Sequence, residues 1–591
     1  MKVPPSATAL LLAAHAILIA PAGGIPNCPY PGPAFPKPTS LATSDAIKTA
    51  IANMTATFNA RASDPATNPN GTSWSIQVFS ASDADDTPLW SHYHTATNIL
   101  TADTPGVKSI DGDTVFRLGS VTKIFTILTF LIEAGDTYWN TPVTQWVPEL
   151  ELLAGKAQYD PVMNVDWDSI TLQDLASHLA GIVRDYAIEG ELTQENNQTV
   201  LESKGFPPAP RNKTPTCGEA IKCPRAEFFT GLANVPPSFS PSWTAGYSNM
   251  GYQILAYALQ AITQKQFAPM LQSDIIDKLE LQKTFYQKPD DGLGVIPEGQ
   301  EDGWSYSLGE SSPTGNMYSS ASDLSRLGRA IFRHTLLSPS QTRRWLKPTA
   351  LTSDLHEGVS SPWGIRRIPL QDGSRVVDAY SKAGSINVYM SLLVLLPDYD
   401  VGIVALLAGG WPGNANWDIA DNIGRVLVPA LEDAAREEAE RNYAGTYTAV
   451  DGEGQGEGLN STLVLSTDPA RPGLGVERWV SNGTDMIPVA VRYTLNYNVT
   501  GPSIRIYPTG LESAAAEDGT KKVAFKAVVE NLDLPDRGGA MFSTNCGTWV
   551  SQTAAVYADM PLDQFVFTLD KDGRATAVTP LALRTALMRD G

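Results

Sequence analysis

Ser120 and Lys123 are the residues whose types and spacing point most directly to chemistry in this chain. A serine hydroxyl is a poor nucleophile at neutral pH, and it needs a base to take its proton and a field that favours the alkoxide. Apolar residues at helical spacing follow, as far as Leu131 and Ile132, so Ser120 is expected near a helix start, where the dipole favours negative charge. Lys123 then shares the helix face of Ser120, and if that face is desolvated the lysine pKa falls and the amine can act as a base.

Sequence context distinguishes this Ser-x-x-Lys, the only one in the chain, from a solvated lysine on a helix. Residues 116–119 are typical of an extended segment whose final glycine allows a tight entry into the helix. Tyr247 and Asn249 form a second set, in a loop that leads into a helical run, which is where site residues tend to be held. The tripeptide at 138–140 also fits Tyr-x-Asn, but it follows the first helix too closely, so its aromatic residues are expected to pack.

The segment at 116–123 resembles the active-site motif of serine β-lactamase-like proteins. That superfamily includes penicillin-binding proteins, class C β-lactamases, D-aminopeptidases, related esterases and some acyltransferases. Within it, the chain resembles class C β-lactamase-related, fungal-type secreted members with an extra C-terminal β domain. The resemblance spans about residues 45–440, and further segments match the family in order at 141–142, 146–150, 170–181, 247–249, 315–324, 363–364 and 382–384.

The resemblance implies catalytic roles for Ser120, Lys123 and Tyr247, with an acyl-enzyme formed on the serine. Lys123 and Tyr247 would share the proton transfers, and which of them is the base stays open. The resemblance also makes the segment at 382–385 an edge strand that lines the site. The backbone N–H groups of Ser120 and Ser385 would then form the oxyanion hole, in which one donor is worth ~3–4 kcal/mol.

Three further residues complete the implied substrate-binding set, namely Asn249, Lys382 and Gly384. The Asn249 amide can donate and accept hydrogen bonds, so it can orient Lys123 or a substrate amide. Lys382 is a cation that could lower the pKa of the Tyr247 phenol. Penicillin-recognising members carry a hydroxyl residue where this chain has Ala383, so an ester, an amide or an acyl-transfer substrate is favoured over penicillin.

The expected fold is α/β (α+β): an antiparallel sheet flanked by helices plus an all-α lobe, as in β-lactamases and transpeptidases, with a C-terminal all-β domain. A hairpin is expected at 73–80 and 89–94, and a long helix at about 417–441. Lys571-Asp572-Gly573 is expected to be a hairpin turn. Further strands are expected at 392–396, 401–407, 462–465, 489–493, 504–507, 523–528 and 565–569. The predicted domains are a signal peptide at 1–22, a catalytic domain at 40–441 and the β domain at 442–591.

Length and charge bound the possible partners. The 591 residues suffice for a large enzyme core plus a second domain, and a net charge of −20 argues against nucleic acid. Residues 1–22 have a basic start, an apolar run and small residues for cleavage, which predicts a secreted protein. No later segment is apolar enough for a membrane span, so none is expected in the mature chain. Glycosylation sequons lie at Asn53, Asn70, Asn197, Asn212, Asn460, Asn482 and Asn498.

Cysteine and histidine usage indicates disulfides and no metal. Four cysteines in an oxidising compartment permit three pairings. The short, proline-flanked loop favours Cys217 with Cys223, which leaves Cys28 with Cys546. Two imidazoles at 92 and 94 are expected to face solvent on a strand, without a third metal ligand. The glycine-rich stretch at 452–458 lacks a following helix, so it is not a phosphate loop, and no cofactor is expected.

Three functions fit these observations. The first is a secreted serine hydrolase that cleaves a small-molecule ester, amide or lactam. The second is an acyltransferase or transesterase of secondary metabolism on the same fold, which would pass the acyl group to a nucleophile other than water. The third is a non-catalytic binding protein, although that would predict damage to the motif set, and the set is intact. An α/β-hydrolase is disfavoured because the chain has no Gly-x-Ser-x-Gly.

Overall fold

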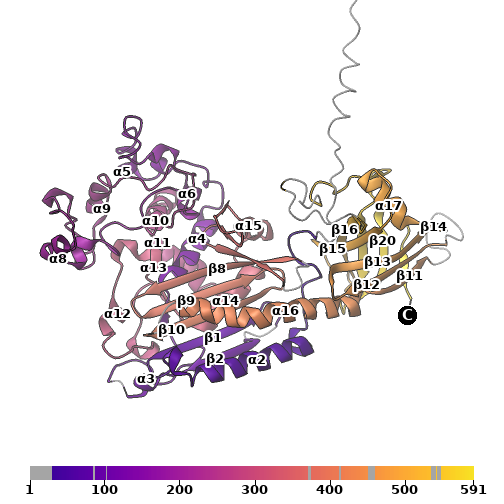
Figure 1. The fold of residues 1–591 in the computed structure, drawn as a ribbon, viewed down its shortest axis with the longest axis horizontal. Helices are drawn as coiled ribbons and strands as arrows, with labels where there is room; N and C mark the ends of the chain where they lie inside the picture. The colour runs from indigo at the N-terminus through magenta and orange to yellow at the C-terminus, as the bar shows by residue number, and fades with distance from the viewer. Residues whose placement is uncertain are drawn as a thin grey trace, which may run out of the picture. The chain divides into compact units, whose positions relative to one another are not determined.

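The computed structural model describes residues 29–83, 87–101, 103–370, 375–410, 414–449, 460–533, 541 and 548–590. These residues form two compact units. One consists of Lys48–Ile368 and Asp378–Leu427, and the other of the remaining described segments (Figure 1).

The first unit is built on an eight-stranded sheet in the order β2-β1-β10-β9-β8-β7-β6-β5. The central strands are apolar almost throughout, as expected for strands covered on both faces. The strands are β1 Thr72–Ser80, β2 Trp90–His94, β5 Ala350–Leu351, β6 Glu357–Val359, β7 Gly364–Pro369, β8 Val376–Ile386, β9 Tyr389–Leu396 and β10 Val401–Gly409.

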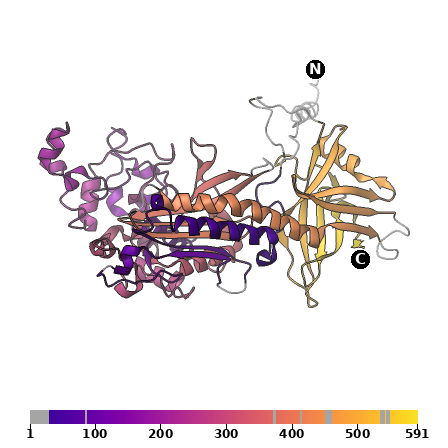
Figure 2. The same ribbon diagram turned by 60° about the horizontal axis from the view of Figure 1, so that its bottom comes forward.

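Two helices cover opposite faces of this sheet. Successive side chains of a strand point to opposite faces, so Gln77 and Phe79 of β1 share one face. Helix α14 (Ala321–Phe332) packs there, and Ser325 donates to Gln77 Oε1 at 2.8 Å. Helix α2 (Asp45–Arg61) covers the other face and packs on Trp90 of β2 (Figure 2).

A helical lobe follows strand β3 (Phe116–Arg117) in the chain and lies beside the sheet in Figure 1. Its central helix is α4, in which the residues from Thr122 to Leu131 are all buried. A helix surrounded by protein on all sides keeps water away from any polar side chain it carries. The helices are α4 Thr122–Glu133, α5 Pro148–Glu151, α6 Leu172–Ala176, α7 Leu192–Glu195, α8 Gln198–Ser203, α9 Arg225–Leu232, α10 Met250–Thr263, α11 Phe267–Leu271, α12 Glu301–Ser305 and α13 Ser312–Gly315.

The second unit holds a nine-stranded antiparallel sheet in the order β12-β11-β21-β20-β19-β16-β15-β13-β14. This sheet closes on itself, because β13 pairs with β12 as well as with β15. Aromatic side chains such as Trp479 and Phe565 fill its interior. The strands are β11 Gly445–Ala449, β12 Thr462–Asp468, β13 Arg471–Ser481, β14 Thr484–Asp485, β15 Pro502–Glu512, β16 Lys521–Asn531, β19 Gln564–Leu569, β20 Ala575–Pro580 and β21 Leu587–Arg589.

The remaining elements are short, apart from α16. They are α3 Thr97–Thr101, α15 Pro339–Trp345, α16 Ala415–Tyr443, α17 Met486–Leu495 and the paired strands β3 Phe116–Arg117 with β4 Tyr318–Ser319 and β17 Val556–Tyr557 with β18 Met560–Pro561.

The expected fold class is confirmed, as an α/β sheet-and-helix core of the β-lactamase type plus a sheet-rich C-terminal region. The strand expected at 489–493 is wrong, because that segment lies in helix α17. Asp485 caps its first turn by accepting from the Ile487 N–H at 3.1 Å, and Asn496 ends it in the left-handed conformation. The turn at 571–573 lies between β19 and β20 as expected.

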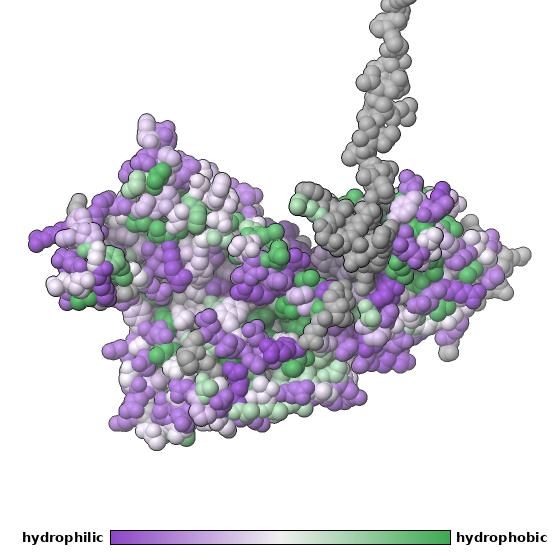
Figure 3. Space-filling view, viewed as in Figure 1, coloured by the Kyte–Doolittle hydropathy of each residue, from purple (hydrophilic) through white to green (hydrophobic). Residues whose placement is uncertain are grey.

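Most side chains on the face shown in Figure 3 are hydrophilic. Among the described residues, no helix combines the length and the hydrophobicity needed to cross a membrane.

Candidate active site

Ser120 lies in a 3₁₀ turn, Gly119–Val121, that leads directly into α4. The first N–H groups of a helix have no intrahelical acceptor, so the backbone around Ser120 can bind a developing negative charge. Gly119 has a φ of +50°, and a Cβ there would lie 2.7 Å from the backbone nitrogen of Ser385. Both the conformation and the close approach therefore require glycine at this position.

Lys123 points at Ser120 from the next turn. Its side chain is fully buried, and Nζ donates to Ser120 Oγ at 3.0 Å, to Asn249 Oδ1 at 2.7 Å and to the Thr314 carbonyl at 2.7 Å. Burial lowers the pKa of Lys123 to about 7, against the opposing effect of the Asp185 carboxylate. The amine is therefore close to half neutral at pH 7, as a base requires.

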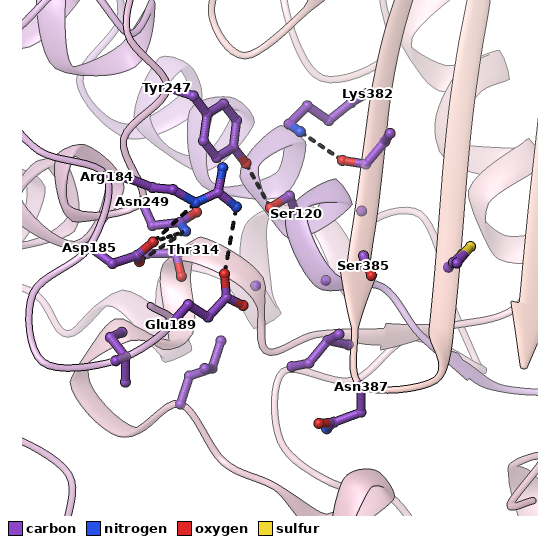
Figure 4. Close-up of a pocket in the computed structure, with 18 of the residues that line it drawn as sticks. Ser120, Arg184, Asp185, Glu189, Tyr247, Asn249, Thr314, Lys382, Ser385 and Asn387 are labelled. Carbon is purple, nitrogen blue, oxygen red and sulfur yellow. Dashed lines mark hydrogen bonds and ion pairs between the residues drawn. The ribbon is translucent and has the colours of Figure 1, made fainter. Parts of the chain in front are cut away.

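Tyr247 contacts the same serine oxygen as Lys123. Its hydroxyl donates to Ser120 Oγ at 2.7 Å (Figure 4). Two cations lie near its ring, with Lys382 Nζ and the Arg184 guanidinium carbon 5.2 and 5.0 Å from the ring centroid. Both positive charges therefore lie close to the phenol.

His178 supports Tyr247 from behind. The two ring centroids are 4.4 Å apart, and His178 Nδ1 accepts from the Ser248 N–H at 3.2 Å. Burial lowers the pKa of His178 well below its usual value, so this imidazole is neutral. The residue is buried and adopts a φ of 62°.

Asn249 links Lys123 to a carboxylate. Its Nδ2 donates to Oδ1 and Oδ2 of Asp185 at 2.9 and 3.0 Å, while its Oδ1 faces Lys123. The Asp185 side chain is only 4% exposed, and burial raises its pKa. Arg184 Nε lies 3.3 Å from the same carboxylate.

The segment at 382–385 belongs to β8 and approaches Ser120 closely. A Cβ at Gly384 would lie 2.7 Å from the Ser120 backbone nitrogen and 2.0 Å from the Leu118 carbonyl oxygen. The N–H groups of Ser120 and Ser385 are thus held on neighbouring stretches of backbone, as an oxyanion hole requires. The expected edge strand is wrong, because β7, β6 and β5 follow β8 in the sheet.

Lys382 is buried, and Nζ donates to the Ala383 carbonyl at 2.7 Å. Burial lowers the pKa of Lys382 to about 8, while the Tyr247 hydroxyl opposes that shift. Lys382 therefore supplies a cation with little solvent around it, beside the phenol.

A pocket of about 550 Å³ opens at Ser120. Its wall carries charged groups at Arg184, Glu189 and Glu219, and aromatic groups at Tyr306 and Trp417. Such a volume and mixed lining suit a small molecule.

The expected Cys217–Cys223 disulfide is present, and the loop that it closes reaches this pocket through Glu219. Lys222 of the same loop lies over the ring of Tyr306, with Nζ 3.8 Å from the centroid. The other expected pair, Cys28 with Cys546, lies outside the described residues.

His92 and His94 do not face solvent as expected. Both are partly buried, and the ring of His94 stacks on Trp74 with centroids 4.2 Å apart. The Trp74 indole N–H also donates to His92 Nδ1 at 3.1 Å, so these imidazoles belong to the packing between β1, β2 and α2. Within the described part of the chain, no three His, Cys, Asp or Glu residues gather as metal ligands would.

The structure thus brings together Ser120, Lys123, Tyr247 and Asn249, with Lys382 beside them. Sequence reasoning missed Asp185 and Thr314. Thr314 contributes its carbonyl oxygen, so its residue type gives no signal. Asp185 follows shortly after the segment at 170–181, which resembles the family. That position is the signal in the sequence that could have pointed to Asp185 as a site residue.

Comparison with known proteins identifies the family of this chain. The beta-lactamase family profile matches residues 85–416. The chain belongs to the beta-lactamase family. A second profile, described as a beta-lactamase-like-like C-terminal domain, matches residues 435–591.

Several family relatives match over nearly the whole chain. A beta-lactamase-like protein of Arthroderma benhamiae is 29% identical over 96% of both chains. A probable hydrolase of Cochliobolus lunatus is 27% identical over 94% of this chain and 89% of its own. Among solved structures, the class C beta lactamase of Rhodobacter sphaeroides is 16% identical, with a TM-score of 0.45, over 64% of this chain and 99% of its own.

Proposed function

We propose that this protein is a serine hydrolase that cleaves a small-molecule ester or amide through an acyl-enzyme on Ser120. The observation that carries the proposal is that one oxygen, Ser120 Oγ, lies within hydrogen-bond distance of both Lys123 Nζ and the Tyr247 hydroxyl. A nucleophile held between an amine and a phenol, at a helix start, has what acyl transfer requires.

Lys123 is assigned as the base in this proposal. A neutral amine has two N–H groups and one electron pair. Asn249 Oδ1 and the Thr314 carbonyl can only accept, so they take the two N–H groups. The electron pair then faces Ser120, whose hydroxyl donates to it.

The reaction follows from that arrangement. Ser120 Oγ bonds to the acyl carbon while its proton passes to Lys123, and the carbonyl oxygen takes negative charge between the Ser120 and Ser385 N–H groups. The bond to the leaving group breaks as Tyr247 gives that group a proton, and Lys123 returns its proton to the phenol. Water then attacks the acyl-enzyme with the same base, which releases the acid and restores Ser120.

Labelling with an active-serine phosphonate tests this proposal. The wild-type protein should gain one phosphonyl group on Ser120, and Ser120→Ala should lose both the label and at least ~10³ in rate on any ester turned over. Ser63→Ala, in an exposed turn after α2, is the matched control and should label normally. Full labelling of Ser120→Ala would discard the nucleophile.

A panel of esters, D-amino amides and a chromogenic β-lactam would define the substrate. Release of the free acid identifies a hydrolase, whereas an acyl group found on an added alcohol or amine identifies the acyltransferase alternative. A protein that binds panel members without labelling or turnover would be the non-catalytic alternative.

Export is part of the proposal. Residues 1–22 provide the secretory signal pattern, and six sequon side chains, at Asn53, Asn70, Asn197, Asn460, Asn482 and Asn498, are exposed. Secreted protein should therefore begin after residue 22 and lose mass on treatment with an N-glycosidase. Retention of an intact residue 1 would contradict export.

A further inference from the structure

A buried carboxylate lies behind the Lys123 amine, one side chain away. The two oxygens of Asp185 lie 2.9 and 3.0 Å from Asn249 Nδ2 (Figure 4). Asn249 Oδ1 lies 2.7 Å from Lys123 Nζ, and Lys123 Nζ lies 3.0 Å from Ser120 Oγ. A continuous row of contacts thus runs from Asp185 to the nucleophile.

The donors and acceptors along this row of contacts have a fixed order. An ionised carboxylate only accepts hydrogen bonds, whereas an amide accepts at one end and donates at the other. Asp185 therefore requires Nδ2 of Asn249 to face it, which leaves Oδ1 to face Lys123. An amide turned the other way would place its oxygen against the carboxylate and its N–H groups against the amine.

The direction of the amide decides where the Lys123 electron pair points. With Asn249 Oδ1 and the Thr314 carbonyl as acceptors, neutral Lys123 has both N–H groups engaged. With the amide reversed, Nδ2 would compete for the electron pair that Ser120 needs. We propose that Asp185 is a positioning residue that acts through Asn249 to aim the free electron pair of Lys123 at Ser120. This inference rests on the proposed function, because it assumes that Lys123 is the base.

Asp185 also acts on Lys123 through its charge. Among the groups that face the amine, Asp185 is the main one that favours the ammonium form, followed by Glu189, and Arg184 opposes both. Arg184 is 61% exposed, so solvent screens much of its effect. From other elements, neutral His178 and the rings of Tyr247 and Tyr252 face the amine, with the two ring centroids 5.2 and 5.3 Å from Nζ, and Lys382 lies beyond Tyr247.

Asp185→Asn removes the negative charge of this side chain but keeps its hydrogen bond with Asn249. The carboxamide introduced by this substitution can still present its oxygen to Asn249 Nδ2, so the Asn249 amide keeps its direction, but the negative charge is gone. Because kcat/KM requires neutral Lys123, the acidic limb of the plot of kcat/KM against pH follows the pKa of that amine. Removing a charge that favours the ammonium form lowers this pKa, so the limb should move to lower pH by on the order of one unit.

Two further variants test position itself. Asp185→Ala releases the amide, and kcat should fall about 10- to 100-fold with a smaller change in KM. The exchange of the two residues, Asp185→Asn with Asn249→Asp, keeps a donor–acceptor pair in the same volume but places a carboxylate directly on Lys123. Its acidic limb should therefore move to higher pH, opposite to that of Asp185→Asn.

Asp323→Asn is the matched control. Asp323 is also a buried carboxylate, and it lies in the first turn of α14, outside the pocket. It accepts hydrogen bonds from the Lys283 N–H and the Thr284 hydroxyl. Loss of that carboxylate can lower the amount of folded protein, but it should leave the acidic limb in place. Rates are normalised to the number of sites labelled by the phosphonate, so that misfolded protein does not count.

The outcomes are distinct. Wild-type kcat and KM in a folded Asp185→Ala protein would overturn the positioning role of Asp185. An acidic limb that stays in place in both Asp185→Asn and the exchanged variant would overturn the effect of its charge on Lys123, even if activity falls. Should one of these two variants fail to fold, the other still gives the decisive shift. The proposed function fails separately, if Ser120→Ala keeps its label.

Discussion

Gly384→Ala tests whether the close approach of β8 to Ser120 matters. A Cβ at position 384 would lie 2.0 Å from the Leu118 carbonyl oxygen, 2.6 Å from Ser391 Oγ and 2.7 Å from the Ser120 nitrogen. Two of these three atoms belong to backbone, so β8 must move away from the 118–120 segment. Overpacking of this kind costs about 1–3 kcal/mol of stability.

The effect on rate should exceed the effect on stability. Movement by even ~1 Å takes one N–H donor out of reach of the oxyanion, and loss of one such donor costs ~10²–10³ in kcat. Lys123 and Tyr247 contact the side-chain oxygen of Ser120 and not its backbone N–H, so the pKa that governs the acidic limb should stay in place.

Steady-state kinetics on the best ester of the panel, with thermal unfolding in parallel, measure both effects. Gly364→Ala in β7 is the matched control, since its nearest neighbour, Ser381 Oγ, would lie at an ordinary 3.6 Å. A folded Gly384→Ala protein with wild-type kcat would refute the oxyanion-hole assignment. A Gly364→Ala protein with the same loss would show that any alanine in this part of the sheet is harmful.

Three further predictions concern the base, the acid and the core. Tyr247→Phe should lose most of kcat, whereas Tyr138→Phe, in the other Tyr-x-Asn tripeptide, should keep it; equal kinetics in the two would contradict the role of Tyr247. Plots of kcat/KM against pH should rise with an acidic limb near the Lys123 pKa of about 7, because only the neutral amine is a base, and a flat profile from pH 5 to 9 would exclude it. Gly328→Ala should lower Tm despite the better helix propensity of alanine, since its Cβ would lie 2.1 Å from a buried phenylalanine ring, while Gly424→Ala, with nothing within 4 Å, should raise Tm slightly.

The central site residues could be predicted from sequence because they lie in ordered motifs. Ser120 lies in the turn that leads into α4 and Lys123 in the first turn of that helix, and Tyr247 with Asn249 precedes another helix, so each pair carries its own local pattern. The two pairs meet at one oxygen only in the tertiary structure. In the sequence, this meeting was suggested only by the order of the motifs along the chain.

The features that the sequence did not predict have physical explanations. Thr314 acts through its backbone, which has the same chemistry in every residue. The segment at 489–493 has strand-favouring valine and tyrosine at alternate positions, but its capping residues and packing favour a helix. The imidazoles at 92 and 94 were assigned to the solvent face because the sequence did not show that α2 covers that face of β2.

The disulfide between Cys217 and Cys223 has a practical consequence for anyone who produces this protein. The loop that it closes brings Glu219 to the pocket wall, so the shape of that wall depends on the redox conditions during folding. Protein made in a reducing cytosol would carry an open loop. Substrate preferences recorded on such material would describe a pocket that the disulfide-bonded protein does not have.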